Sequence, residues 1–548
     1  MTQPRISRTE WRWVAVFAGL VMLVTCIPYW LAWGQNSRPF SGFFFGIEDG
    51  HSYLGKMRLG ARGELDFTLF YTPEAHEAEP LVFLPYILPG WIVGRFFDSS
   101  DPALTPTLIG VFHLMRILFG ALMIAVIYAF AARFLDHVNQ RRLALVVAVF
   151  GGGLPLLQLA LLRDTTPLEM YTPEAFSWLI LLGIPHLALA RSALLGGLLF
   201  LIDAQNQERW IGRALLAALC WIVTGLAVPF YLAILYCIVG AWGLASLVRT
   251  RRFPSVLFVR AFVACGLTLP LFFYYAVAFT QNQAFAIWSA QNNLPSPSLL
   301  EYLFAYGLLG VLAFVAFFRL RREMEPRFML LVGWLAAVPF LVYLPINVQR
   351  RMSEAVLIPL AILAALTLER LRRGLRITAF IVLCSSSGLL LAFAFLFADD
   401  PQGAPPVSPL SVELDAFNWL SANAEPGAVI MTAVDTGNAL PAYVDLRVFM
   451  GHGPETLFWP EKTSLLEAFY RSTLSDEEIL ELARHPCAAE FECVGPLRYV
   501  FYGPAEQRLA GRATPPRWME RLDATLIYSA VDILDGRVQI YEISAPPG

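Results

Sequence analysis

The sequence predicts a mainly α-helical, polytopic membrane bundle of about eleven spans, followed by a C-terminal extracytoplasmic α/β domain. Three observations support this fold class. The chain has 548 residues, of which 57% are hydrophobic and 15% charged, and its mean hydropathy is +0.57, unlike a soluble protein. Apolar runs able to cross about 30 Å of hydrocarbon recur over the first four hundred residues. Near Asp399 the composition becomes that of a globular domain.

We expect the spans at 12–33, 108–134, 143–162, 175–202, 212–229, 231–248, 258–279, 299–318, 327–344, 354–369 and 375–398. The first run is too long for a signal peptide, lacks a small-residue cleavage site and ends in Trp30 and Trp33, which predicts an uncleaved helix. The segments 49–60 and 81–97 are a short and a proline-broken run, and we expect both to be helices on the membrane surface.

Basic residues predict the orientation of the spans. With eleven spans, the arginine-rich segments fall on one face: Arg5, Arg8 and Arg12, Arg141 with Arg142, Arg209 with Arg213, Arg249–Arg252, Arg319–Arg322 and Arg370–Arg376. The positive-inside rule makes that face cytoplasmic. A span at 81–97 would invert the orientation of all later spans and place their arginine-rich segments outside. We therefore expect a multi-pass protein of the plasma (inner) membrane, with a cytoplasmic N-terminus and an extracytoplasmic C-terminal domain.

The chain divides into a membrane domain at 1–398, whose first outer loop covers about 34–106, and an α/β domain at 399–548. A linker rich in proline follows Asp399. The periodicity beyond it predicts helices at 411–423, 464–471 and 475–484 and strands at 428–432, 499–502, 525–529 and 538–543. Cys487 and Cys493 fall in this domain, where an oxidising compartment would allow a disulfide; two unpaired thiols are the alternative.

Several classes of function are excluded or disfavoured. The arginines form no continuous stripe, so nucleic-acid binding has no support. No Cys/His set has zinc spacing, and neither a phosphate loop nor a nucleotide-binding fingerprint is present. A lipid-linked donor therefore fits better than a nucleotide sugar. Lysine occurs only as Lys56 and Lys462, which we interpret mainly as a compositional bias.

The segment Glu48-Asp49-Gly50-His51-Ser52-Tyr53 is the strongest candidate for chemistry. It follows the first span on the predicted outer face, where two carboxylates against a bilayer are costly to maintain. Asp49 is a candidate general base, because burial in an interfacial pocket raises a carboxyl pKa. The alternative is that Glu48 and Asp49 only stabilise the N-terminus of the helix that follows.

Asp49 with Tyr53 four residues later, a long first outer loop and many later spans resemble the GT-C superfamily of polyprenyl-phosphate-sugar-dependent glycosyltransferases. Protein O-mannosyltransferases and aminoarabinose transferases share this layout. The resemblance covers the membrane part and implies that Asp49 is the catalytic base or a metal ligand. Many relatives have a second acidic residue directly after this aspartate; here that position is Gly50, and the extra carboxylate, Glu48, comes before it.

Transfer of a sugar from a lipid phosphate needs cations for the departing phosphate as well as a base. Arg350 and Arg351 lie between two spans on the predicted outer side, where guanidinium groups can bind phosphate. His113 and Arg116 share a helix face near the outer end of the second span, which makes Arg116 a second phosphate partner. The alternative for the arginine pair is snorkelling into the headgroups.

Other polar residues are candidates for the acceptor or donor pocket. Tyr71-Thr72-Pro73-Glu74-Ala75 is repeated as Tyr171-Thr172-Pro173-Glu174-Ala175, and both copies fall on the outer side. Four of these outer residues could line the acceptor pocket or hold a divalent ion: His76, Glu77, Glu169 and Glu174. His452 and Glu455, in a glycine-rich turn of the outer domain, could contact the acceptor or the donor. Loop structure and helix capping are the alternative for each.

The sequence thus predicts an inverting membrane glycosyltransferase that moves a sugar from a polyprenyl-phosphate donor to a lipid, glycan or protein acceptor on the outer face. Asp49 is the base, Glu48 supports it, and a divalent cation (Mg²⁺ or Mn²⁺) on Asp49 and Glu48 is the only cofactor considered. Two alternatives remain: a non-catalytic transporter or scaffold for envelope polysaccharide, and a polymerase or ligase of lipid-linked glycans. A transporter would concentrate charges at mid-membrane, whereas here they gather at the outer boundary.

Overall fold

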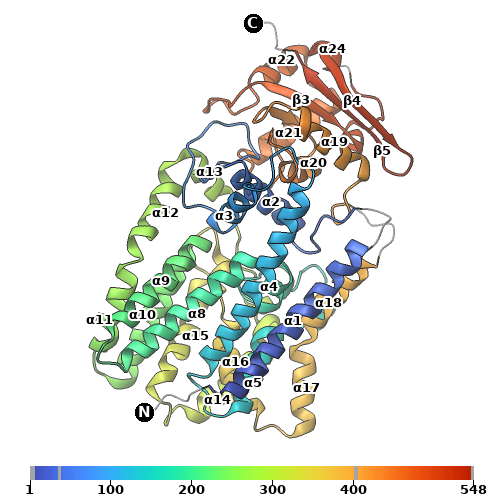
Figure 1. The fold of residues 1–548 in the computed structure, drawn as a ribbon. Coiled ribbons are helices and arrows are strands. Elements are labelled where there is room, and N and C mark those ends of the chain that lie inside the picture. Colours follow the sequence, from blue (N-terminus) through green and yellow to red (C-terminus); the bar gives the residue numbers. More distant parts are fainter. Residues whose placement is uncertain (1–5, 35–38, 400–404, 517, 545–548) are drawn as a thin grey trace. The chain divides into compact units, whose positions relative to one another are not determined.

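The computed structural model describes residues 6–34, 39–399, 405–516 and 518–544 (Figure 1). The chain forms two compact units. The first comprises Met1–Pro28, His113–Ala276 and Asn293–Ala398, and the second comprises Tyr29–Phe112, Val277–Asn292 and Asp399–Gly548. The linker expected after Asp399 lies mostly outside the described residues, and our division into two domains at that point stays a prediction.

Apolar helices of very different lengths make up the first unit. They are α1 (Arg8–Gly34), α4 (Leu104–Ala131), α5 (Val138–Phe150), α6 (Pro155–Leu161), α7 (Ser177–Gly183), α8 (Pro185–Gln205), α9 (Ile211–Ala227), α10 (Tyr231–Thr250), α11 (Ser255–Gly266), α12 (Leu269–Gln281), α14 (Leu299–Leu320), α15 (Met329–Leu341), α16 (Leu357–Leu368), α17 (Arg373–Leu383) and α18 (Ser385–Ala398). Short 3₁₀ turns η1 (Leu168–Met170), η2 (Pro326–Phe328) and η3 (Gln349–Ser353) lie among them. Three helices, α1, α4 and α12, continue into the second unit.

These helices confirm a multi-pass membrane protein. Among the described residues, six helices are long and apolar enough to cross a membrane, or up to nine if each bent pair counts as one span. Nine of the predicted spans coincide with them. The other two, 212–229 and 327–344, fall on the shorter apolar helices α9 and α15.

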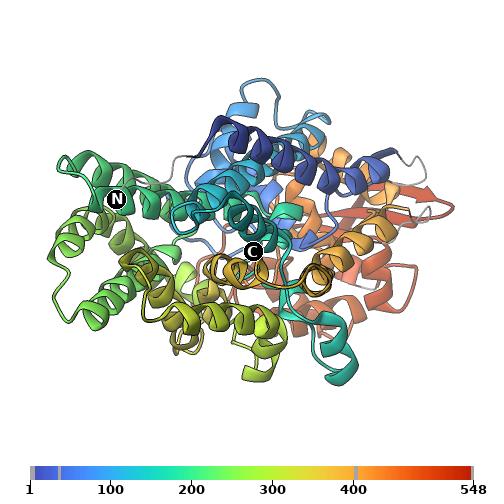
Figure 2. The ribbon, with the colours of Figure 1, turned by 90° about the horizontal axis from the view of Figure 1, so that it is seen from below.

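Small residues set how closely the helices of the bundle pack. The helices α8 and α9 lie side by side, as both views show (Figures 1 and 2). Gly197 on α8 makes room for the indole of Trp221 on α9, because a Cβ at this position would overlap the ring. The fully buried Trp221 then donates its indole N–H to the Leu194 carbonyl at 3.2 Å.

In the second unit, α2 (Ile47–Ala61) and α3 (Leu84–Val93) pack against each other with their backbones nearly touching. A Cβ at Gly60 would overlap the Ile87 carbonyl, and one at Gly90 would overlap the Met57 carbonyl. These two helices confirm the helices predicted at 49–60 and 81–97. Ten residues extend only about 15 Å, so α3 is too short to span a membrane; its position on the surface stays a prediction.

The second unit also contains a five-stranded sheet of order β2-β1-β3-β5-β4. Its strands are β1 (Val429–Met431), β2 (Arg447–Val448), β3 (Leu497–Tyr502), β4 (Ala524–Asp532) and β5 (Gly536–Ile543). The β1 strand pairs in parallel with β2 and β3, whereas β5 is antiparallel to both β3 and β4. All four predicted strands are therefore confirmed, and only β2, two residues long, was missed.

The second unit also contains shorter helices: α13 (Gln283–Gln291), α19 (Ser411–Asn423), α20 (Val434–Ala439), α21 (Trp459–Arg471), α22 (Asp476–Arg484), α23 (Pro504–Ala510) and α24 (Trp518–Arg521), with the 3₁₀ turn η4 (Leu440–Ala442). The three predicted helices correspond to α19, α21 and α22. Tyr470 of α21 is buried in the core and donates its hydroxyl to the carbonyls of Met431 at 3.1 Å and Phe501 at 2.9 Å. This side chain therefore links α21 to the ends of β1 and β3.

Candidate active site

The α2 helix begins with both predicted carboxylates exposed. Its N-cap is Gly46, in the left-handed conformation at φ 56° and without a capping side chain. Glu48 and Asp49 lie in the first helical turn, where negative charge is favourable, and the Asp49 side chain is 57% exposed. An exposed carboxylate at this position is accessible to a substrate.

Gly50 explains why this chain lacks a second acidic residue after Asp49. A Cβ at Gly50 would lie 2.6 Å from ring atoms of Phe43, which is 2% exposed. The aromatic ring therefore covers the backbone at this position, and no larger side chain fits without moving it.

His452 contacts Asp49 from a loop four hundred residues further along the chain. Its Nε2 lies 3.2 Å from Asp49 Oδ1, and its ring stacks on Tyr71 at 5.5 Å between centroids. The loop is closed locally, since Thr456 N–H donates to the His452 carbonyl at 2.9 Å and Gly451 N–H donates to Thr456 Oγ1 at 3.1 Å. The structure thus brings together two residues that the sequence predicted separately.

Glu455 lies behind His452 and is nearly buried. Its Oε1 accepts hydrogen bonds from Ser52 Oγ at 3.0 Å and Lys56 Nζ at 2.7 Å, and lies 3.9 Å from His452 Nδ1. Lys56 is fully buried and also donates to Ser52. Both Lys56 and Ser52 project from α2, so one helix carries Asp49 and the cation that faces Glu455.

Burial and charge act in opposite directions on His452. Burial lowers its pKa, but the negative charges of Glu455 and Asp49 outweigh burial, so that the pKa of His452 is raised above its ordinary value. Burial lowers the pKa of Lys56, and Glu455 opposes this shift. Burial also raises the pKa of Tyr71, which therefore stays neutral. The two carboxylates therefore make His452 easier to protonate than a free imidazole.

His51 and Asn438 form a neutral polar contact on the same helix. His51 Nδ1 lies 3.0 Å from Asn438 Oδ1, and Asn438 Nδ2 donates to the Glu48 carbonyl at 3.3 Å. Full burial lowers the pKa of His51 to about 4. Asn438 therefore fixes the first turn of α2 through both of its amide atoms.

Two other predicted residues of this unit have structural contacts. Tyr53 stacks on Tyr86 of α3, with ring centroids 4.4 Å apart and planes at 10°. His76 accepts a hydrogen bond from Leu69 N–H at 2.9 Å on Nε2 and has Nδ1 2.8 Å from the Glu74 carbonyl. Because both ring nitrogens contact the backbone, the structure favours the alternative of loop structure for His76; its role in the acceptor pocket stays a prediction.

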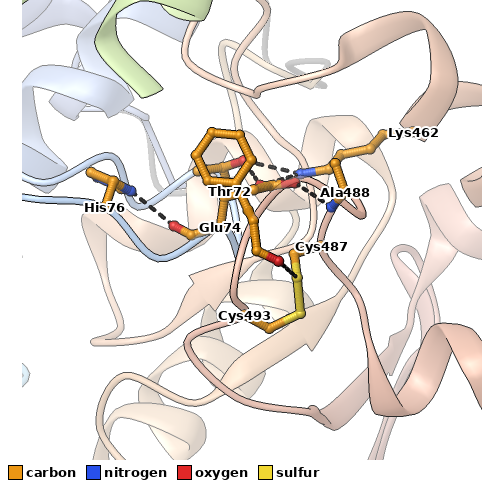
Figure 3. The surroundings of a disulfide bond; sticks show 8 residues. Thr72, Glu74, His76, Lys462, Cys487, Ala488 and Cys493 are labelled. Atoms are coloured by element: carbon orange, nitrogen blue, oxygen red, sulfur yellow. Dashed lines mark hydrogen bonds and ion pairs between the residues drawn. A yellow bond between two sulfur atoms is a disulfide. The ribbon is translucent and has the colours of Figure 1, made fainter. Parts of the chain in front are cut away.

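A disulfide joins Cys487 and Cys493, which decides between the two states considered for these cysteines. Figure 3 shows this disulfide beside Glu74, with Thr72, Lys462 and Ala488 next to the Glu74 carboxylate. Glu74 is fully buried, pairs with Lys462 Nζ at 2.7 Å and accepts from Ala488 N–H at 3.0 Å. Both lysines of the chain are therefore buried and paired with glutamates. The interpretation of the lysine content as compositional bias did not foresee that each lysine has a structural role.

The predicted phosphate-binding arginines belong to the first unit. Arg350 and Arg351 are adjacent and partly exposed on η3. Arg350 lies over the Tyr171 ring at 4.8 Å, and Arg351 pairs with Glu174 at 3.0 Å. Tyr171 and Glu174, both from the second copy of the repeated pentapeptide, thus contact Arg350 and Arg351.

A fully buried ion pair follows η3 directly. Arg191 donates to Glu354 through Nε at 2.7 Å and Nη2 at 2.8 Å, and Tyr231 donates to the same carboxylate at 2.5 Å. Arg191 also donates to the Glu174 carbonyl. Sequence reasoning missed this pair because Arg191 lies inside a predicted span, although an ionisable residue at such a position is itself a signal.

Arg116 is surrounded by protein. It is 1% exposed and donates to His113 Nδ1 at 3.2 Å, Thr25 Oγ1 at 2.9 Å, the Leu181 carbonyl at 3.0 Å and Cys26 Sγ at 3.1 Å. These contacts give Arg116 a role in packing the helices. Its binding to phosphate, with His113, stays a prediction without support from this geometry.

Metal binding by Glu48 and Asp49 also stays a prediction. In the part of the chain that the structure describes, no group of three or more His, Cys, Asp or Glu side chains is arranged to hold a metal ion. Of the donors near Asp49, His452 contacts its carboxylate directly at 3.2 Å, and Glu455 is already paired with the Lys56 ammonium at 2.7 Å. This donor set does not fit a divalent ion.

No protein-family model matches the chain, and no curated protein matches it in sequence. Solved structures do resemble its fold. The arabinofuranosyltransferase AftD from Mycobacteria aligns with 98% of this chain and 40% of its own at TM-score 0.53 and 16% identity. AglB, the oligosaccharyltransferase from Archaeoglobus fulgidus, aligns with 91% of this chain and 70% of its own at TM-score 0.52 and 12% identity. ArnT from Cupriavidus metallidurans aligns with 98% of this chain and 99% of its own at TM-score 0.50 and 12% identity. The chain therefore shares its fold with these three proteins, in agreement with the resemblance of its first outer loop to glycosyltransferases of this kind.

Proposed function

We propose that this protein is a membrane glycosyltransferase that moves a sugar from a polyprenyl-phosphate donor to an acceptor hydroxyl on the outer face of the plasma membrane. The observation that carries the proposal is the exposed Asp49 carboxylate at the start of α2, 3.2 Å from His452 Nε2. The fold supports the donor class: ArnT was solved bound to undecaprenyl phosphate and AglB in complex with a dolichol-phosphate.

Asp49 is the base in this proposal. It accepts the acceptor hydroxyl proton while the oxygen attacks the anomeric carbon and the lipid phosphate leaves from the opposite side, which inverts the anomeric centre. Arg350 and Arg351 bind the departing phosphate, because two adjacent, partly exposed guanidinium groups suit phosphate oxygens. Glu48 contributes negative charge beside the base.

The test is donor consumption by the purified full-length protein in liposomes. Radiolabelled undecaprenyl-phosphate hexoses and pentoses are supplied on the outer leaflet with bacterial envelope lipids and glycans as acceptors, and UDP-sugars serve as the comparison. We expect label to leave one lipid donor and to enter a product with an inverted anomeric centre. Label that crosses the bilayer on an unchanged donor indicates the transporter, and products with long repeats indicate the polymerase; either result contradicts the proposal.

A further inference from the structure

Lys56 and Glu455 form a buried ion pair directly behind the contact between Asp49 and His452. The pair measures 2.7 Å, with side chains 0% and 5% exposed. Ser52 bridges it, since its Oγ donates to Glu455 at 3.0 Å and accepts from Lys56. Burial this deep leaves Lys56 no surface for a substrate.

Aromatic rings enclose the Lys56 ammonium. Its Nζ lies 3.9 Å from the ring centroid of Phe83 and within 6 Å of three more rings, those of Tyr53 at 5.7 Å, Phe67 at 5.4 Å and Phe70 at 5.9 Å. Cation–π contacts offset part of the desolvation of the ammonium. Even so, two apolar side chains would fill such a space as stably or more so. The charges of Lys56 and Glu455 are therefore not explained by the stability of the fold. Their other effect is on the pKa of His452.

Four charged groups alternate in sign along this row. Asp49 and His452 are 3.2 Å apart, His452 and Glu455 are 3.9 Å apart, and Glu455 and Lys56 are 2.7 Å apart. The groups that act on His452 are Glu455, Asp49 and Lys56, and the neutral Tyr71 stacks on its ring. Among these charges, Glu455 raises the pKa of His452 most, and Lys56 lowers it less.

We propose that Lys56 and Glu455 are positioning residues, which act through His452 to hold Asp49 oriented for its role as base. This inference rests on the proposed function. Lys56 holds the Glu455 carboxylate in place through the 2.7 Å contact, the charge of Glu455 favours protonation of His452, and His452 Nε2 contacts Asp49 at 3.2 Å. None of the three touches the reacting atoms.

The test replaces the pair by neutral side chains of similar size, Lys56→Met/Glu455→Gln, in the full-length protein. Histidine labelled with ¹³C at Cε1 reports the titration by NMR, and with seven histidines in the chain the His452→Gln variant assigns the signal. We expect the His452 midpoint to move to lower pH and kcat at pH 7 to fall roughly tenfold, with little change in KM for the lipid donor. If this variant fails to fold, Lys56→Gln/Glu455→Gln keeps a hydrogen bond between the two positions.

Lys462→Met/Glu74→Gln is the matched control, since it neutralises another buried 2.7 Å pair that has no contact with His452. We expect it to leave the His452 midpoint unchanged. An unmoved midpoint in the Lys56 variant, or an equal shift in both variants, overturns the positioning role. If the wild type transfers no sugar, the proposed function itself fails, whatever the midpoint does.

Discussion

His452 Nε2 lies 3.2 Å from Asp49 Oδ1, although the two residues are 403 positions apart in the chain. The contact joins the first turn of α2 to a loop that precedes α21. It places an imidazole with a raised pKa against the carboxylate that the sequence predicts to be the base. The chemistry proposed for Asp49 therefore depends on two chain segments of the second unit, Tyr29–Phe112 and Asp399–Gly548.

Close packing between α2 and α3 leads to a stability prediction. Gly90→Ala would force a methyl group onto the Met57 carbonyl, and overpacking of this kind costs about 1–3 kcal/mol. We expect a lower Tm for the full-length protein in detergent. Gly495→Ala is the control, because nothing lies within 4 Å of a Cβ there; equal Tm values for the two variants would contradict the packing.

The buried His51 predicts acid lability. Its folded pKa of about 4 lies below the ordinary value of 6.5, so between these values the unfolded state binds more protons than the folded state. Stability should therefore fall as the pH drops from 6.5 to 4, by roughly 3 kcal/mol for this group. Tm measured against pH should show a smaller acid loss in His51→Gln than in the wild type. Identical slopes would show that His51 is protonated in the folded protein.

The raised pKa of His452 predicts a pH effect of opposite sign. Its contribution to stability is fully present below pH 6.5 and is lost as the pH rises through the folded pKa. Tm should decline on this alkaline side in the wild type, and the decline should be smaller in His452→Gln. A wild-type Tm that is flat above pH 6.5, or a variant with the same decline, would count against the imidazolium.

Removing one partner of the Lys56–Glu455 pair should destabilise more than removing both charges. Lys56→Met leaves Glu455 buried without its cation, and an uncompensated buried charge costs about 3–5 kcal/mol. We expect the Tm of Lys56→Met to lie below that of Lys56→Met/Glu455→Gln. The reverse order would contradict the ion pair between Lys56 and Glu455.

The arginine pair on η3 predicts a change in lipid binding. Arg350→Gln removes one charged donor beside Arg351, and a hydrogen bond to a charged group contributes about 1.5–3 kcal/mol. The Kd for undecaprenyl phosphate should rise by roughly tenfold or more in a binding assay. Arg322→Gln, an exposed arginine of a predicted cytoplasmic segment, should leave it unchanged; equal losses in both variants would indicate non-specific attraction.

Sequence reasoning succeeded where a local pattern determines the structure, since hydrophobic runs predicted the helices of the bundle. The position of Asp49 after the first span predicts a candidate base, and this role stays a prediction. It could not foresee that Lys56 faces Glu455, because 399 residues separate them and only tertiary packing brings them together. Arg116 shows the converse. The rule that charges inside spans are functional predicts that Arg116 binds a ligand, whereas in the folded chain its guanidinium donates to Thr25 and to the Leu181 carbonyl.

The most direct test of the central claim compares Asp49→Asn with Glu48→Gln in the liposome transfer assay. Both substitutions remove one exposed carboxylate from the first turn of α2, so helix stability changes about equally in the two variants. If Asp49 is the base, Asp49→Asn lowers kcat by roughly 100-fold or more, while Glu48→Gln retains most of the activity. Equal transfer by Asp49→Asn and wild type would contradict the account.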